Sequence, residues 1–223
     1  MGTCERWFAA QCSDVFNVID AIPHRETQEL TVRSYLLEST GALGNNVFSK
    51  LLQGLQSAEL RYLYLFRSAS DWISVLTGIQ GDLEPGDASN LLLRLSSKFE
   101  TLDCFADEHQ MVSRASCFFE KKLVWSVSHD EGEGSDHLSS SGALPSCFKS
   151  VLKREIAIGS ESLPEPSNQV KTGKTLPSPY KKFKRKPKLF EVPPEVSYQV
   201  SGYKYSMSIP ETVKLYKLEL LRD

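Results

Sequence analysis

The stretch Leu60-Arg61-Tyr62-Leu63-Tyr64-Leu65-Phe66 decides how the first half of the chain is interpreted. Its aromatic residues are typical of a strand, whereas Ser57 before it and the helical patterns on both sides favour a buried helix. We favour the helix. On this interpretation residues 1–126 form one continuous set of helices.

The segments before this stretch also have helical spacing. Between residues 3 and 22 apolar side chains recur at steps of three and four residues, and Pro23 ends the pattern. A second helix is expected over 26–40. A third is expected to begin after Asn46, which is a good helix cap, and to continue to about residue 55.

The segments after this stretch continue the helical pattern. Ser68 and Asp71 have the spacing of a capping box, and Pro85-Gly86 ends the apolar pattern that follows them. Asp87 is expected to open the longest helix, whose apolar stripe reaches Ala106 and beyond. We therefore predict a mainly α protein, in which residues 1–126 form a protein-binding bundle of about six helices.

The composition changes after residue 126. Residues 127–146 are rich in Ser, Gly and acidic side chains, which is typical of a disordered linker. A short apolar patch follows at 147–158. Residues 159–190 are rich in Ser, Pro and Lys, and we interpret them as a second, basic linker.

Residues 191–223 are expected to fold as a small unit. Residues 196–200 and 203–209 alternate between apolar and polar side chains, and Ser201-Gly202 separates the two runs. This pattern predicts a β-hairpin, which a helix starting at Pro210 would close. Because a lone hairpin is marginally stable in water, it should pack on the bundle, on a strand such as 123–127, or on a partner protein.

Charge is unevenly distributed along the chain, whose net charge is −2. Residues 149–190 hold 11 basic and 3 acidic side chains, a balance of +8. The balance is −5 over 1–126, −4 over 127–148 and −1 over 191–223. Such an asymmetry is informative about partners and solubility, but not about fold.

The basic block lies within Tyr180–Lys188. Its Lys-Arg-Lys-Pro-Lys end resembles a monopartite nuclear localisation signal, which predicts a nuclear protein that binds a nuclear import receptor. Contact with DNA or RNA phosphates is an alternative that can coexist with import, and a solvating charge run is a third. The residues that carry this prediction are Lys181, Lys182, Lys184, Arg185, Lys186 and Lys188.

A phosphorylation site is predicted beside the basic block. Ser178-Pro179-Tyr180-Lys181 resembles the Ser-Pro-x-Lys consensus of cyclin-dependent kinases. Phosphate on Ser178 would add a charge of roughly −1.5 to −2 next to the lysines and would weaken the binding of an import receptor or of nucleic acid.

Two sets of apolar residues are candidate docking sites for partner proteins. Phe190 and Val192 precede Pro193-Pro194, as in short docking motifs stiffened by proline. This stretch resembles the Phe-x-Leu-x-Pro peptides that telomere-repeat-factor homology domains bind, with Val192 in place of the leucine, and no function is carried over from it. An alternative is that these residues lead into the first hairpin strand. The second set is aromatic, with core burial as its alternative, and comprises Tyr62, Tyr64, Phe66 and Trp72.

No motif in the sequence identifies a catalytic residue, a cofactor or a metal. The sequence contains no Cys-x-x-Cys or His-x-x-x-His pair. Lys171-Thr172-Gly173-Lys174-Thr175 resembles the end of a phosphate-binding loop, but Asn168 stands where the first glycine is needed. Five scattered cysteines and no run of 18 apolar residues favour reduced thiols and no membrane partner.

These observations lead to three hypotheses. The first is a non-catalytic nuclear adaptor or scaffold subunit of a multiprotein complex, serving chromosome maintenance or cell division, which binds nuclear proteins through the helical domain and the C-terminal hairpin. The second is an accessory factor whose basic block contacts nucleic acid, with a binding constant that falls steeply with salt. The third is an enzyme with an unrecognised site.

Overall fold

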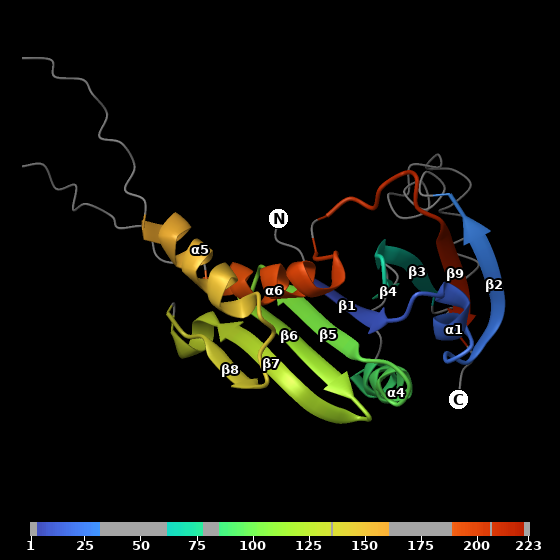
Figure 1. The fold of residues 1–223 in the computed structure, drawn as a ribbon, viewed down its shortest axis with the longest axis horizontal. Coiled ribbons are helices and arrows are strands. Elements are labelled where there is room, and N and C mark those ends of the chain that lie inside the picture. The colour runs from blue at the N-terminus through green and yellow to red at the C-terminus, as the bar shows by residue number, and fades with distance from the viewer. Residues whose placement is uncertain are drawn as a thin grey trace, which may run out of the picture.

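The computed structural model describes residues 4–31, 62–77, 85–134, 136–160, 189–205 and 207–220. Its centre is a nine-stranded antiparallel sheet in the order β2-β9-β3-β4-β1-β5-β6-β7-β8 (Figure 1). The strands are β1 Cys4–Gln11, β2 His24–Leu30, β3 Tyr62–Ala69, β4 Trp72–Thr77, β5 Thr101–Asp107, β6 Val112–Phe119, β7 Lys122–Asp130, β8 Ser139–Gly142 and β9 Leu215–Leu220. The described helices are α1 Val15–Ile19, α4 Pro85–Ser96, α5 Phe148–Ser160 and α6 Val192–Ser201, with short 3-10 turns η1 Glu131–Glu133 and η2 Leu189–Glu191.

The predicted mainly α fold with an N-terminal helical bundle is wrong, because the described residues build mainly antiparallel sheet. Most of the segment 3–22 is strand β1 and the short helix α1, and the described start of 26–40 is strand β2. Residues 32–61, which include the third expected helix, lie outside the described residues. The stretch around Tyr62–Phe66 is strand β3, which was the alternative to the helix that we favoured.

The reason for this error is visible in β1. Trp7 and Ala9 belong to a core cluster on one face of the sheet, and Phe8 and Ala10 belong to a second cluster on the other face. Because both faces are covered here, four consecutive side chains are buried and the alternation of a half-exposed strand disappears. A continuous apolar run of this kind matches a helical pattern as well as a strand.

The two layers of helices cover opposite faces of the sheet. Helix α6 packs on β5 to β7, and α5 packs beside α6 and η2 and adds Phe148 and Val151 to the first cluster (Figure 1). Helices α1 and α4 supply side chains to the second cluster, with β1, β3, β4 and β9. The part of the sheet around β3 and β4 is therefore buried on both faces. Six of the seven residues of β5 are also buried, and β6 to β8 are covered mainly on one face.

The elements between residues 68 and 119 also differ from the prediction. Ser68 does not cap a helix; its hydroxyl donates a hydrogen bond to the backbone oxygen of Ser201, 2.7 Å away, from within β3. A helix does span Asp87, but α4 ends at Ser96, and the rest of the expected long helix is the hairpin of β5 and β6. The apolar stripe that suggested one helix consists of inward-facing positions in separate elements.

The expected disordered linker 127–146 contains ordered elements. It includes the end of β7, the turn η1 and the edge strand β8. His129 Nδ1 donates to the backbone oxygen of His137, at 2.6 Å, and the Asp130 N–H donates to His137 Nδ1, at 3.2 Å. These bonds hold a polar sequence in place without a large core of its own. The apolar patch at 147–158 corresponds to helix α5.

The C-terminal β-hairpin and closing helix are likewise wrong. The residues expected to form the first hairpin strand are in α6, which has proline in its first turn, a position that favours helix. Gly202 does adopt a positive φ, of 77°, but it ends α6 instead of turning a hairpin. A Cβ at Gly202 would lie 2.5 Å from the backbone oxygen of Ser68. The expected closing helix is replaced by strand β9.

Strand β9 joins distant parts of the chain. It lies between β2 and β3 and pairs antiparallel with both. Leu215 and Leu218 on β9 are fully buried, one in each core cluster. Residues 189–220 therefore contribute to both layers of the fold, and they are not a separate unit.

Candidate functional site

One side of β5 to β8 carries a row of polar and aromatic side chains. The strand register aligns Arg6 of β1 with Phe105, Phe105 with Arg114, and Arg114 with Ser128, which faces Ser139 of β8. This row lies on the side of the strands opposite to α5 and α6, which is the side on which α4 contacts β1 and β5 (Figure 1). We call this surface, defined by these five residues, the polar face.

A buried carboxylate organises the two arginines of the polar face. Arg6 donates from Nε and Nη2 to the two oxygens of Asp103, at 2.9 and 3.0 Å. Arg114 Nη2 donates to Asp103 Oδ2, at 3.1 Å. The Asp103 side chain is 5% exposed, against 24% for Arg6 and 44% for Arg114. The carboxylate therefore lies beneath the guanidinium groups, and the three side chains together carry one net positive charge.

Hydroxyl groups continue the polar face toward the edge of the sheet. Ser116 and Ser126, on neighbouring strands, share a hydrogen bond of 2.9 Å. Ser128 is half-buried, and the residues of β8 are exposed. The register places Ser139 and Ser141 on the same side as Ser126 and Ser128. Hydroxyls beside guanidinium groups are donors that suit an anionic ligand.

The sequence contains a signal for the polar face that the helical interpretation missed. Residues 113–117 read Ser-Arg-Ala-Ser-Cys, and residues 125–129 read Trp-Ser-Val-Ser-His, with buried and polar side chains in alternation. This period of two is typical of a strand with one covered face. As a hairpin, these two runs place Arg114 and Ser128 side by side.

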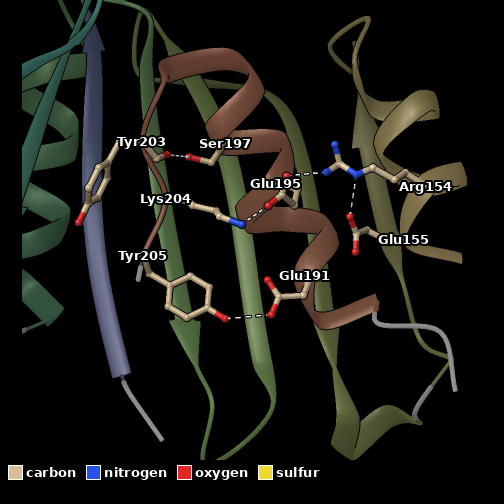
Figure 2. Close-up of polar contacts among 8 residues, drawn as sticks. All are labelled: Arg154, Glu155, Glu191, Glu195, Ser197, Tyr203, Lys204 and Tyr205. Carbon is tan, nitrogen blue, oxygen red and sulfur yellow. Dashed lines mark hydrogen bonds and ion pairs between the residues drawn. The ribbon is translucent and has the colours of Figure 1, made fainter. Parts of the chain in front are cut away.

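The opposite side of the same strands carries a different polar cluster, between α5, α6 and the chain after α6 (Figure 2). Arg154 Nη2 lies 2.5 Å from Glu195 Oε2, and Lys204 pairs with the other oxygen of Glu195. The Tyr205 hydroxyl donates to Glu191, at 3.2 Å. These pairs connect two helices and the following segment, so their role is to hold α6 in place.

The same cluster shifts the pKa values of its members. Hydrogen bonding to Glu155 is the main cause that raises the pKa of Arg154. Burial, and then the nearby charges of Glu191 and Glu108, raise the pKa of Tyr205. Tyr205 therefore stays protonated and acts as a hydrogen-bond donor.

The aromatic residues singled out in the sequence are part of the core. Tyr64, Phe66 and Trp72 are at most 8% exposed. Tyr62 is half-buried and has Lys217 Nζ 4.2 Å from its ring centroid. Phe190 and Val192, the candidate docking residues after the basic block, are also buried. The structure thus uses these side chains to pack β3, β4, η2 and α6.

Phe190 also anchors the chain that follows the basic block. Its backbone oxygen accepts a hydrogen bond from Ser113 Oγ, at 2.7 Å, and its ring meets His129 edge-on. The basic residues Lys181, Lys182, Lys184, Arg185, Lys186 and Lys188, together with Ser178, lie outside the described residues.

The buried cysteines are poor candidates for nucleophiles. Burial is the main cause that raises the pKa of the Cys104 and Cys117 thiols, so both stay protonated. The Cys104 thiol donates to Ser197 Oγ, at 3.1 Å, and the Cys117 thiol donates to Glu100, at 3.3 Å. Both groups act as packing and hydrogen-bonding elements of the sheet.

Metal ligation and membrane insertion find no support among the described residues. No group of three or more His, Cys, Asp or Glu side chains in this part of the chain is arranged to hold a metal ion. Within the same ranges, no helix has the length and apolar character needed to cross a membrane.

Comparisons of the chain with models of protein families, with curated proteins and with solved structures found no match. Function is therefore inferred from the residues of this chain.

Proposed function

We propose that this protein is a non-catalytic nuclear subunit, in which the layered body binds other macromolecules and the basic block directs nuclear import. The observation that carries the proposal is the contrast between the basic block and the rest of the chain. Residues 181–188 hold six basic and no acidic side chains, in a protein of net charge −2. The expected process, chromosome maintenance or cell division, stays a prediction, and so does the absence of enzymatic activity.

The attachment of the basic block supports this proposal. Helix α5 ends at Ser160 and η2 begins at Leu189, so the 28 residues 161–188 connect two elements of the same layer. Helix α5 contacts both η2 and α6. Lys188 directly precedes Leu189, which is only 6% exposed. The segment that contains the block is thus joined to the folded body at both ends.

The chemistry of the block suits an acidic receptor groove. A cluster of lysine and arginine side chains binds acidic surfaces through charge, and the interaction weakens as salt screens it. Phosphate on Ser178, three residues before Lys181, would add roughly −1.5 to −2 charges and would weaken the same interaction.

The test is the distribution of the protein in cells, measured on a fusion with a fluorescent carrier too large to enter the nucleus by diffusion. The block variant changes Lys184, Arg185, Lys186 and Lys188 to glutamine. The control makes the same change at four exposed lysines on the folded body, Lys98, Lys121, Lys122 and Lys149. We expect the block variant to lose nuclear accumulation and the control to keep it; equal distributions for the two variants would contradict the proposal.

The phosphorylation hypothesis has a separate test in the same cells. Ser178→Glu should lower the nuclear fraction and Ser178→Ala should preserve it, because only the first adds a negative charge beside the lysines. An unchanged distribution for Ser178→Glu would reject the switch while leaving the import proposal in place.

The second candidate function, association with nucleic acid, gains support from an observation separate from the basic block. On the polar face, Arg6 and Arg114 occupy the two strand positions that pair with Phe105.

A further inference from the structure

We propose that the polar face binds single-stranded nucleic acid, with phosphate groups on Arg6 and Arg114 and a base stacked on Phe105. This inference goes beyond the proposed import function and rests on residues of the sheet alone. Nothing in it depends on where the protein is found in the cell.

The spacing of the row suits a nucleotide chain. Neighbouring strands lie about 4.8 Å apart, so the row from Arg6 through Phe105 to Arg114 spans about 10 Å. The register puts Phe105 between Arg6 and Arg114 on neighbouring strands. Both guanidinium groups turn toward Asp103, and that of Arg6 lies 5.2 Å from the centroid of the Phe8 ring. A half-exposed ring on a sheet is the surface on which unpaired bases stack, and guanidinium groups beside it bind the phosphates that connect them.

The electrostatics of the row favour an anion. Asp103 neutralises one of the two arginines, but its carboxylate lies below them and is nearly inaccessible. A ligand that approaches the sheet therefore meets guanidinium groups first. The three bonds to Asp103 also fix the direction of both side chains before binding, which reduces the entropy lost when the ligand binds.

The surroundings of the row favour a nucleic acid over a protein. The neighbours are the half-buried Ser126 and Ser128 on β7, and β8 adds exposed serine at the edge. Serine is depleted in protein interfaces, whose centres are apolar, whereas hydroxyl groups commonly donate to phosphate oxygens. The half-exposed ring of Phe105 also suits a single strand better than a duplex, because unpaired bases are free to stack on it.

The test measures the binding of the full-length chain to fluorescent oligouridylate of about 12 nucleotides, to its DNA counterpart and to a duplex of equal length, by anisotropy. Phe105→Leu keeps an apolar side chain and removes the stacking ring. Arg114→Gln removes one exposed charge. Arg25→Gln, at the far edge strand β2, is the control with the same charge change.

The expected results separate stacking from charge. Phe105→Leu should weaken single-strand binding by about 5- to 100-fold and leave its salt dependence unchanged. Arg114→Gln should weaken binding and reduce the slope of log K against log salt by about 0.7. Arg114→Lys should restore that slope, and Arg25→Gln should bind as the unchanged protein does. Thermal unfolding of each variant identifies any that fail to fold. If Phe105→Leu fails to fold, Arg114→Gln decides the test.

Four outcomes would overturn the proposal. The first is the absence of single-strand binding at low salt, and the second is a preference for the duplex. The third is tighter binding of a phosphoserine peptide that is equally sensitive to Arg114→Gln. The fourth is binding that neither Phe105→Leu nor Arg114→Gln changes.

The block variant described above distinguishes the basic block from the polar face as the source of charge. If it weakens binding while Phe105→Leu still adds its own loss, the polar face is supported; if it abolishes binding and Phe105→Leu changes nothing, the basic block alone is responsible. Neither result alters the import test.

Discussion

The two halves of the sheet differ in how they are covered. In the half formed by β9, β3, β4 and β1, side chains on both faces are buried, and Leu63, Tyr64, Leu65 and Phe66 are consecutive core residues. In the half formed by β5 to β8, α5 and α6 cover one face, and the other face carries polar side chains. The first half is a structural core, and the second presents the polar face.

This difference in burial explains why strands of one sheet have two different sequence patterns. A strand covered on both faces needs apolar residues at every position, so its period of two is lost. A strand covered on one face keeps the alternation, as residues 124–130 of β7 do. The exposed side chains of the polar face are Arg114 and the serines of β8, and this is where a ligand has access.

The largest effect on folding is expected when residues 189–223, which contain α6 and β9, are removed from the protein. Cleavage within 161–188 should leave residues 1–160 and 189–223 associated, because α6 and β9 are held by buried contacts to the rest of the fold. After separation in denaturant, residues 1–160 alone should fail to refold, since β2 and β3 lose the strand between them. Circular dichroism and thermal unfolding would measure both states.

Remixing the two fragments is the control for this experiment. The native spectrum should return when residues 189–223 are added back. A cooperative unfolding transition for residues 1–160 alone would contradict the view that the C-terminal segment is part of both layers.

The next largest effect is a difference in the free energy of unfolding between variants of two phenylalanines, which lie on the same side of neighbouring strands. Phe8 on β1 is fully buried under the second layer, whereas Phe105 on β5 is half-exposed on the polar face. Phe8→Ala should lower the free energy of unfolding by about 3–5 kcal/mol. Phe105→Ala should lower it by about 0.5–1.5 kcal/mol. Urea denaturation measures the free energy of unfolding of both variants. Equal decreases would contradict the distinction between the two halves.

The smallest effect concerns Glu5 on β1, the strand that pairs with both halves. Burial, and then the charge of Glu108, raise the pKa of Glu5 above its ordinary value of 4.5. The folded protein therefore holds the proton more tightly than the unfolded chain. The resulting stability is present below pH 4.5 and is lost as the pH rises through the raised pKa.

Glu5→Gln imitates the protonated side chain and tests this linkage. It should raise the melting temperature near pH 7 and make little difference at about pH 4, where the wild-type side chain is already protonated. Glu26→Gln, on the exposed side of β2, removes the same charge and should show no such pH dependence. A pH-independent gain for Glu5→Gln would mean that folding does not raise the pKa of Glu5.

Parts of the fold could be predicted from local sequence patterns. A helix was expected at Asp87 and α4 includes it, because the preceding Pro-Gly pair and the apolar spacing after it are local signals. The positive φ of Gly202 was expected as well, but the residue ends a helix. At Tyr62–Phe66 the favoured helix is wrong and its strand alternative is right, because a doubly buried strand and a buried helix share one apolar pattern.

The polar face could not be predicted from local sequence patterns. Arg6 and Asp103 are separated by 97 positions in the chain, and only the pairing of β1 with β5 brings them into contact. Glu195 joins Arg154 of α5 to Lys204 in a similarly non-local manner. No spacing rule within a single element predicts such contacts.

The sequence by itself determined the segregation of charge, the supply of apolar residues and the positions of several turns, since composition and backbone preferences act locally. Only the tertiary structure decided that these residues form a sheet, that β9 is inserted between β2 and β3, and that Arg6, Phe105 and Arg114 form one row. The physical reason is that strand pairing joins distant segments, and its free energy depends on which faces the rest of the chain buries.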